Sequence, residues 1–494
     1  MGKQRKNLII FLSDNHAGGL MGCAGHPIVK TPNLDGLASR GTLFRKAYTT
    51  SPICCPARAS LATGRYPHET GYWDNVLAYD GKTPSWMHRA RDAGVTVASI
   101  GKLHYRGGDD YGFTQEILPM HLYGGKGAIR NLLRGYDDEP GKKDSAWYDM
   151  YALSSGVGDT KYQDYDRKIT AAAKAWLEEM AGSRKPWILL VSWVSPHPPF
   201  TVPQRLLDRY PYQHMPLPVG WRGEGWAGHP AYRHIRRLEQ IPDLIEPDVL
   251  RKISSAYFGL ITHLDEQIGE VMDAVEKYAP AETTNLLYTS DHGELFGSHG
   301  LLGKRVFYEQ SVAVPMILAG ADVPAGRRSD QLACHVDLFP TVLEALDIPL
   351  SAEDADLPGR SLFALANRMA AGPDGRLVFA EFHAHGSAAG ASMIRGERYK
   401  LIYHVGMPVQ LFDLAVDPDE TRDVAFDPGY SEVLRCLLDA LREQGRPEAI
   451  DARAKADQRR RVDELGGREQ VSKGEAILFS PPPGEALEPR AKPL

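Results

Sequence analysis

The stretch "NLIIFLSDNH", residues 7–16, predicts the fold of this chain. Its apolar part, residues 7–13, is followed at once by Asp14 and Asn15. A short continuous apolar run is typical of a strand that is buried on both faces of a parallel sheet. Because ligands bind outside the carboxyl ends of such strands, Asp14 and Asn15 lie where a site is expected.

Further apolar runs of the same kind follow along the chain, at residues 95–100, 186–194, 284–290 and 314–320. We expect them to be buried parallel strands. Helix-like segments lie between them, with capping residues or apolar spacing of 3.6 residues, at 31–41, 166–182 and 250–278. Strands that alternate with helices predict an α/β fold, with a large, mostly parallel sheet flanked by helices on both faces.

The pattern changes near residues 370–376, where shorter strand candidates and one helix begin. These are 376–383, 392–405, 409–414 and 430–445, and they predict a small antiparallel sheet with a helix. We therefore expect a catalytic domain at 1–370, a small C-terminal α+β subdomain at 371–450 and an extension at 451–494. The end of the extension, residues 479–494, is rich in proline and does not favour packing on its own. The extension is predicted to help form a homo-oligomer.

Composition and charge exclude several classes of partner. The 494 residues carry a net charge of −6, so bulk charge predicts affinity neither for nucleic acid nor for a membrane surface. No apolar run reaches the ~18 residues of a membrane span, and residues 7–13 are too few for the apolar part of a signal peptide. Five cysteines are too few for a disulfide framework. We expect a cytoplasmic protein.

A second motif, "SDHGE", places Asp291 and His292 directly after the run 284–290. Each motif alone is equally typical of a turn or a helix cap. Together, two strand ends that deliver oxygen and imidazole ligands to one sheet edge predict a divalent cation there, bound by Asp14, Asp291 and His292.

Four cationic or imidazole side chains also follow predicted strands or the second motif. Lys102 and His104 stand in "SIGKLHY" and point to one side if the strand alternation continues. His197 stands in "SPHPPF" and Lys304 in "GLLGKR". Singly, each is more typical of a solvated surface charge or a turn. Converging on a metal-bearing edge, they predict a site for a tetrahedral oxyanion.

The stretch "TTSPICCPARASLATGR", residues 49–65, contains the adjacent cysteines Cys54 and Cys55, which disulfide geometry does not favour as a pair. It matches the sulfatase signature Cys-x-Pro-x-Arg followed by Thr-Gly-Arg. With "SDN", "GKLH", "SPHPPF" and "SDHGELFGSHGLLGK", the match runs through most of residues 7–430. The chain thus resembles the formylglycine-dependent sulfatases of the alkaline-phosphatase-like superfamily. Within them it is most similar in pattern to bacterial choline sulfatases and phosphonate monoester hydrolases.

This resemblance implies that a separate maturation enzyme oxidises Cys54 to formylglycine. The hydrated aldehyde has two hydroxyl groups on one carbon. One attacks the sulfur of the ester, and the other then expels sulfate by re-forming the aldehyde. Cys55 occupies the variable position of the signature and is expected to be a small packed side chain.

The resemblance also implies a role for each site residue. Asp14, Asn15, Asp291, His292 and the oxygen of residue 54 would bind the metal. Arg58 and Lys102 would orient the diol, His104 would be the base, and His197 and Lys304 would hold sulfate and assist the leaving oxygen. Asn75 resembles a site asparagine of the two related groups, and a turn role is equally expected. Calcium is the metal we expect, with manganese or magnesium as alternatives. Asn15 and His292 stand where many relatives have an acidic residue and an asparagine.

The predicted function is hydrolysis of a sulfate monoester. The "GKLH" pair, Lys102 and His104, favours it over the alternative, hydrolysis of a phosphonate monoester or phosphodiester. A non-enzymatic, oxyanion-binding protein is the third alternative, and it would not need Cys54, Lys102, His104 and Lys304 together. The insertion at 103–165 is expected to be irregular. Its tyrosines and Trp147 form either ordinary packing, which we favour, or an aromatic wall for the substrate.

Overall fold

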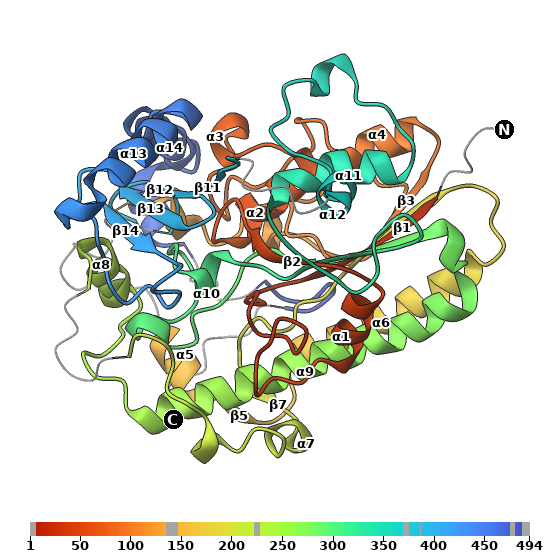
Figure 1. Cartoon of the computed structure of the whole chain (residues 1–494), viewed down its shortest axis with the longest axis horizontal. Helices are drawn as coiled ribbons and strands as arrows, with labels where there is room; N and C mark the ends of the chain where they lie inside the picture. The colour runs from red at the N-terminus through yellow and green to blue at the C-terminus, as the bar shows by residue number, and fades with distance from the viewer. Residues whose placement is uncertain are drawn as a thin grey trace.

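A computed structural model of the chain describes residues 6–134, 147–221, 228–368, 375–385, 387–474 and 480–486. Its centre is an eight-stranded sheet with helices packed on both faces, and a smaller sheet lies beside it (Figure 1). This mixed α/β architecture confirms the predicted fold class. The boundaries predicted for the domains stay a prediction.

The main sheet has the strand order β10-β2-β9-β8-β1-β6-β3-β4. In that order the strands are Arg327–Cys334, Gly41–Tyr48, Met316–Ala319, Thr284–Ser290, Asn7–Ser13, Trp187–Ser192, Thr96–Lys102 and Gln115–Met120. The first predicted strand, β1, lies between β8 and β6 and pairs with both in parallel. The carboxyl ends of β1, β8, β6 and β3 therefore meet at one edge, as the sequence predicted.

One strand runs the other way. The apolar run 314–320 was expected to be parallel, but β9 pairs antiparallel with both β2 and β8. The chain leaves β8 at Ser290 and returns in β9 with only a one-turn helix between them, α10 (Glu309–Val312). A parallel neighbour is usually reached through a crossover helix that packs on a sheet face, and this connection contains no helix longer than one turn. The prediction of orientation was therefore wrong for this strand.

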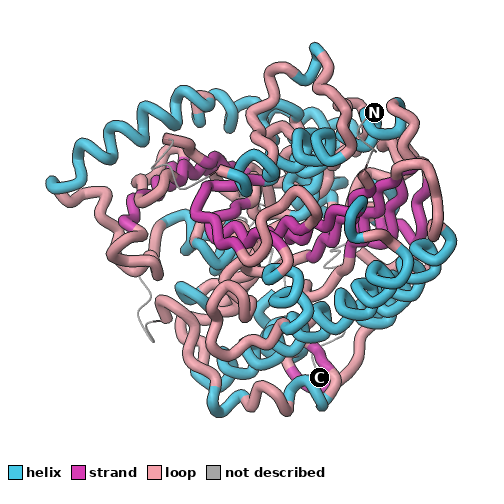
Figure 2. The backbone as a smooth tube through the Cα atoms, turned by 45° about the vertical axis from the view of Figure 1, so that its right-hand side comes forward, coloured by secondary structure: helices cyan, strands magenta, loops and turns pink. Residues whose placement is uncertain are grey.

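Helices cover the two faces of the sheet in separate layers (Figure 2). One face is covered by α1 (Pro32–Ser39), α6 (Lys161–Glu179) and α9 (Pro247–Tyr278). The other is covered by α2 (Cys54–Thr63), α4 (Trp86–Asp92), α11 (Leu338–Ala345) and α12 (Leu362–Asn367). The three predicted helices correspond to α1, α6 and α9. α6 begins earlier than predicted, because Thr160 and Gln163 form a capping box in front of it.

The insertion predicted as irregular holds more structure than expected. It contains the edge strand β4, the helix α5 (Trp147–Ser154) and the short strand β5 (Gly156–Val157). β5 pairs with β7 (Thr201–Val202). The remaining short helices are α3 (Pro67–Thr70), α7 (Gln204–Leu207) and α8 (Pro230–Leu238).

The smaller sheet is antiparallel in the order β11-β12-β13-β14, as predicted. Its strands are Val378–Phe382, Ala391–Arg395, Tyr399–His404 and Gln410–Asp413, and the helix α13 (Ser431–Gln444) packs against them. The predicted strand 392–405 is in fact a hairpin, with a turn between β12 and β13.

The C-terminal extension packs on its own chain. The helices α14 (Pro447–Glu464) and α15 (Gly467–Ser472) follow α13. Ile450 and Ala454 of α14 pack against Trp73, whose indole donates a hydrogen bond of 2.8 Å to Asp457. The sequence did not predict this packing of residues 447–472. Their few apolar side chains do not form a clear helical stripe in the sequence.

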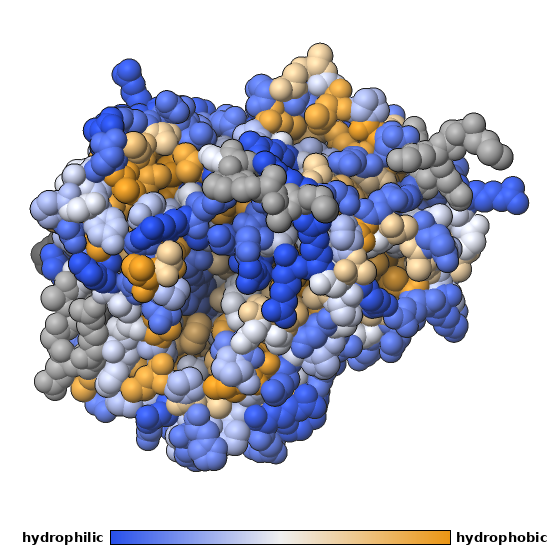
Figure 3. Space-filling view, viewed as in Figure 1, coloured by the Kyte–Doolittle hydropathy of each residue, from blue (hydrophilic) through white to orange (hydrophobic). Residues whose placement is uncertain are grey.

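The face of the molecule in Figure 3 is mostly hydrophilic, with hydrophobic residues in separate small groups. Among the described residues, no helix combines the length and the apolar character needed to cross a membrane. Homo-oligomer formation stays a prediction.

Candidate active site

Cys54 is the first residue of α2, a helix in which all ten residues are buried. No side chain of the preceding residue caps this helix. Instead Asn75, from a distant loop, accepts a hydrogen bond of 3.0 Å from the backbone N–H of Cys55. The helix ends at Gly64, whose φ of 68° favours glycine. The Thr-Gly-Arg element of the sequence thus ends the helix that Cys54 begins.

Four predicted metal ligands meet at the carboxyl ends of β1 and β8. Asp14, Cys54, Asp291 and His292 each offer one ligand atom, and these atoms lie within 4.8 Å of one another. All four side chains are buried. A buried group of two carboxylates, an imidazole and a sulfur atom is a possible metal site.

His292 has the orientation that a metal ligand needs. Its Nδ1 lies 3.0 Å from the carbonyl oxygen of Gly293, which can only accept, so Nδ1 carries the proton. Its Nε2 then presents a lone pair toward Cys54 Sγ, 3.2 Å away. Burial is the main cause that lowers the pKa of His292 to about 4, so the imidazole is neutral near pH 7.

Asn15 lies between the ammonium group of Lys304 and the buried carboxylate of Glu294. Its side-chain oxygen accepts a hydrogen bond of 2.6 Å from Lys304 Nζ. Its Nδ2 donates one of 2.7 Å to Glu294, which also accepts 2.9 Å from the hydroxyl of Tyr151. Glu294 is completely buried. The amide of Asn15 is therefore fixed with its oxygen on the side of Lys304.

Arg58 links the nucleophile helix to the two carboxylates. Its Nε donates a hydrogen bond of 2.8 Å to Asp291, and its Nη2 lies 3.4 Å from a carboxylate oxygen of Asp14. Its Nη1 donates 2.8 Å to the backbone oxygen of Lys102. Burial disfavours the charged guanidinium, but Asp291 and Asp14 keep the pKa of Arg58 above its ordinary value. Arg58 holds strands β1, β3 and β8 around the site.

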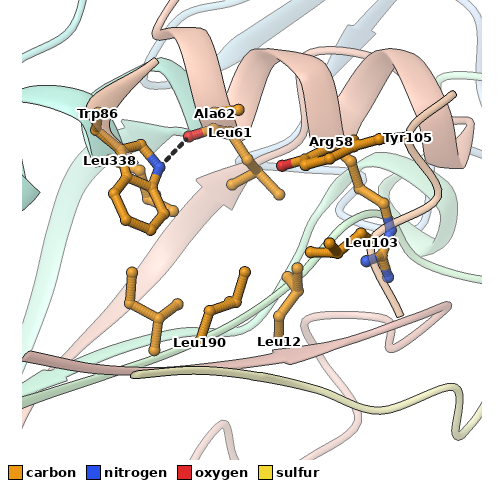
Figure 4. Close-up of a pocket in the computed structure, with 10 residues that line it drawn as sticks. Leu12, Arg58, Leu61, Ala62, Trp86, Leu103, Tyr105, Leu190 and Leu338 are labelled. Carbon is orange, nitrogen blue, oxygen red and sulfur yellow. Dashed lines mark hydrogen bonds between the residues drawn. The ribbon is translucent and has the colours of Figure 1, made fainter. Parts of the chain in front are cut away.

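An apolar cavity lies beneath α2, between that helix and the sheet (Figure 4). Leu12 and Leu190 line it from the sheet, and Trp86 lines it from α4 and donates 3.1 Å to the backbone oxygen of Leu61. Arg58 passes along it, and Figure 4 shows its guanidinium beside Leu103. The cavity has almost no polar lining, so it belongs to the core and not to the substrate site.

Two lysines bring positive charge to Asp14. Lys102 forms an ion pair with its Oδ2, and Lys304 Nζ lies 3.9 Å from its Oδ1 and 3.5 Å from Cys54 Sγ. Burial would raise the pKa of Asp14. The charges of Lys102, His197, Lys304 and Arg58 together outweigh burial and hold it well below its usual range.

His104 lies just beyond the end of β3, in the left-handed region with a φ of 59°. The strand ends at Lys102, so strand alternation does not explain how His104 is oriented. Its backbone oxygen accepts from the thiol of Cys55, and its Nε2 lies 2.9 Å from the hydroxyl of Ser480. Burial, followed by the charges of Lys102 and Arg58, lowers the pKa of His104 well below its ordinary value.

His197 follows β6 in a turn that a buried carboxylate holds. Asp166 of α6 accepts hydrogen bonds of 2.8 and 2.9 Å from the backbone N–H groups of Val194 and Ser195. His197 Nδ1 donates 2.7 Å to the carbonyl oxygen of Pro198. Burial and the charge of Lys304 lower the pKa of His197.

Both cysteines of the signature are buried thiols. Burial and the charge of Asp14 raise the pKa of Cys54 to about 11, so the unmodified side chain is a protonated, weak nucleophile at neutral pH. Cys55 packs with Ala78 and Leu122.

Most aromatic residues of the insertion pack against neighbouring rings. Tyr105 and Tyr111 form a cluster with Tyr79, at centroid distances of 4.9 to 5.7 Å. Tyr151 packs edge-on against Phe200. This arrangement is typical of loop-anchoring packing, the alternative favoured from the sequence.

Three groups around the site were not identified from the sequence: Glu294, Asp166 and Ser480. Glu294 directly follows the "SDHG" motif, so its position along the chain was a usable signal. No local sequence pattern identifies Asp166 or Ser480, because each contacts a segment that is far away in the sequence and near only in the fold.

Residues 6–348 match the family described as "Sulfatase", and residues 297–446 match "N-sulphoglucosamine sulphohydrolase, C-terminal". The choline-sulfatase of Rhizobium meliloti (strain 1021) is 30% identical over 471 residues, which cover 92% of this chain and 90% of that protein.

Two solved structures share the fold. The phosphonate monoester hydrolase of Agrobacterium radiobacter has a TM-score of 0.70 at 24% identity, covering 91% of this chain and 96% of that one. BT4656, in complex with its substrate D-glucosamine-2-N,6-O-disulfate, has a TM-score of 0.70 at 23% identity and covers 89% and 97%. At these identities the likeness shows the fold alone.

Proposed function

The chain belongs to the sulfatase family and is a sulfuric ester hydrolase, and from this premise we propose how it hydrolyses a sulfate monoester. The proposal assigns the nucleophile to residue 54, as formylglycine made from Cys54 by a separate maturation enzyme. It also assigns one divalent cation to the carboxyl ends of β1 and β8. The observation that carries it is the buried group of Asp14, Cys54, Asp291 and His292.

The donor set supports a cation. Asp14, Asp291, the Nε2 lone pair of His292 and the side-chain oxygen of Asn15 would hold it, with residue 54. When bound, the cation would supply positive charge that makes a hydroxyl of residue 54 more acidic and polarises the sulfate. We propose calcium, and manganese is the main alternative because imidazole suits it better.

The state of Cys54 supports the need for conversion. Its thiol is protonated and buried, and a sulfated thiol or hydroxyl would have no internal route to release sulfate. The hydrated aldehyde of formylglycine supplies both a nucleophilic hydroxyl and a second hydroxyl whose loss of a proton expels the sulfate.

The cationic side chains would bind and orient the ester. Lys304 and Lys102, both buried beside Asp14, would balance the negative charge of the sulfate. His197 would hold a sulfate oxygen through Nε2, since Nδ1 is already donated to Pro198. A bound sulfate favours protonation of His197, and the protonated ring would then give its proton to the leaving oxygen.

His104 would accept the proton of the second hydroxyl. Burial keeps its imidazole neutral near pH 7, which is the state that a base needs. The resemblance described from the sequence links the Lys102 and His104 pair with sulfate esters, so we propose sulfate esters as the preferred substrates.

The test is a panel of sulfate monoesters, phosphate diesters and phosphonate monoesters, assayed on protein produced with a maturation enzyme. Peptide mass analysis at residue 54 accompanies each assay. We expect sulfate turnover in proportion to the converted fraction, and loss of turnover in Cys54→Ala. Full activity in protein whose residue 54 is an unconverted cysteine would refute the proposal.

A further inference from the structure

One hydrogen bond connects the C-terminal extension to the predicted base. Ser480 Oγ lies 2.9 Å from His104 Nε2, although the two residues are 376 positions apart in the sequence. The segment 480–486 is held at the start of α6. The hydroxyl of Tyr162 donates 2.7 Å to the backbone oxygen of Ser480, and Lys161 forms an ion pair of 3.1 Å with Glu485.

Tyr162, which holds this segment, lies next to His197 of the predicted site. The ring of Tyr162 packs edge-on against His197, at a centroid distance of 6.0 Å. Ser480 is thus placed by a residue that also contacts the sulfate-binding side of the site. Its contact with His104 is part of a built arrangement of two hydrogen bonds and one ring contact.

The two nitrogens of His104 have different surroundings. Nε2 contacts Ser480, whereas Nδ1 is buried and has no hydrogen-bond partner among the described residues. A buried ring nitrogen without a partner calls for an explanation, and a catalytic role is one of those known. In a neutral imidazole one nitrogen donates and the other accepts, so the contact at Nε2 decides what Nδ1 can do.

We propose that Ser480 is a positioning residue for His104. Its hydroxyl oxygen accepts a hydrogen bond from Nε2–H, so the proton of the neutral ring stays on Nε2. The lone pair on Nδ1 can then take a proton during turnover. The inference rests on the proposed function only in assigning His104 as the base. The hydrogen bond and the tautomer can be measured without any turnover. The extension thereby completes a site whose other parts all come from the first 304 residues of the chain.

The experiment compares four full-length proteins with converted residue 54: wild type, Ser480→Ala, Ser480→Thr and Ser472→Ala. Ser472 is the matched control, because it lies in the same extension and bonds only to the backbone of Glu469. We expect kcat to fall roughly tenfold in Ser480→Ala. A positioned general base typically raises the rate by 10²–10⁴-fold, and a base that is present but poorly oriented loses part of that enhancement. KM should stay within about twofold, because Ser480 does not hold the sulfate. Ser480→Thr, which keeps the hydroxyl, should restore kcat, and Ser472→Ala should match the wild type.

A second measurement tests the tautomer directly. Protein labelled with ¹⁵N-histidine gives nitrogen shifts that distinguish the two tautomers, and His104→Gln assigns the His104 signals. We expect the Nε2–H form in the wild type and in Ser480→Thr, and a mixture of forms in Ser480→Ala. Equal kcat in wild type and Ser480→Ala, or an Nδ1–H form in the wild type, would overturn the inference. Absence of sulfatase activity with an Nε2–H tautomer would instead count against the proposed function alone.

Discussion

At the scale of single residues, Asn15 shows how a predicted ligand is held in place. Many relatives are expected to have a carboxylate where this chain has an amide. Here a buried carboxylate, Glu294, lies directly behind that amide and accepts its Nδ2–H. Glu294 therefore places a carboxylate directly behind a predicted ligand, and the amide oxygen is fixed toward the site.

We expect Glu294→Gln to weaken cation binding by about tenfold. A change behind a metal ligand typically costs 10–100-fold in affinity, and glutamine keeps the shape but removes the charge. Calorimetric titration of the metal-free protein with calcium measures the effect without any turnover. Glu282→Gln, at an exposed position, is the control. Equal affinities in wild type and Glu294→Gln would show that this carboxylate does not support the site.

The sequence identified the residues that stand at strand ends, because a strand's direction and end can be inferred from local patterns. Asp14 and Asp291 are such residues. It did not identify Ser480 as a contact of His104, nor the orientation of the Asn15 amide. Both depend on side chains far away in the sequence, and no local pattern encodes such contacts.

At the scale of elements, α2 depends on a loop for its first hydrogen bond. Asn75 caps the backbone N–H of Cys55, next to the predicted nucleophile. We expect Asn75→Ala to lower the free energy of unfolding by about 1 kcal/mol, the usual contribution of a helix cap. Urea denaturation measures this change.

Asn75→Asp distinguishes a role of Asn75 in the substrate site from a role as the cap of α2. It keeps an acceptor oxygen, so stability should match the wild type. Its added negative charge beside the sulfate site should still lower kcat/KM. If Asn75→Asp instead keeps full activity, Asn75 is a cap and nothing more.

The turn that carries His197 depends in the same way on α6. Burial is the main cause that raises the pKa of Asp166 from 3.8 to about 6. Between these values the folded protein binds more protons than the unfolded chain, so this group's contribution to stability is lost as the pH rises. We expect the free energy of unfolding of the wild type, relative to Asp166→Asn, to fall between about pH 4 and pH 6 and to be constant above.

Urea denaturation of both proteins at several pH values checks this sign. A relative stability that rises with pH would contradict it. We also expect kcat to fall roughly tenfold in Asp166→Asn, because a displaced His197 would meet the ester poorly.

An element could be predicted from the sequence where its apolar residues form a clear pattern. β1 was evident as a continuous apolar run, and α9 was evident from apolar residues at helical spacing. The reversal of β9 was not evident, since the apolar pattern of a strand does not encode its direction. α14 was missed because only scattered residues of it, such as Ile450 and Val462, are buried among charged ones.

At the scale of the whole molecule, a bound cation should stabilise the fold. Without it, Asp14 and Asp291 remain paired with Lys102 and Arg58, so the chain should stay folded after treatment with a chelator. Adding a cation at about 100 times its Kd should stabilise by about 2.7 kcal/mol. We expect the largest rise in Tm with calcium, compared with manganese and magnesium. Asp291→Asn should show a much smaller rise.

The predicted homo-oligomer has its test at this scale too. Light scattering of the full chain and of a chain that ends after residue 474 gives the mass of each. An unchanged mass would show that the last residues do not hold subunits together. A smaller mass for the shortened chain would support the prediction.

The burial of α2 also decides when the chain can be matured. Only 2% of Cys54 is exposed, and every other residue of its helix is enclosed as well. The maturation enzyme proposed above would have to enclose this thiol in its own active site, which is far bulkier to admit than a small sulfate ester. We therefore expect conversion to take place between synthesis and folding. Under the proposed mechanism, a molecule that folds with its thiol intact should stay inactive until it unfolds again.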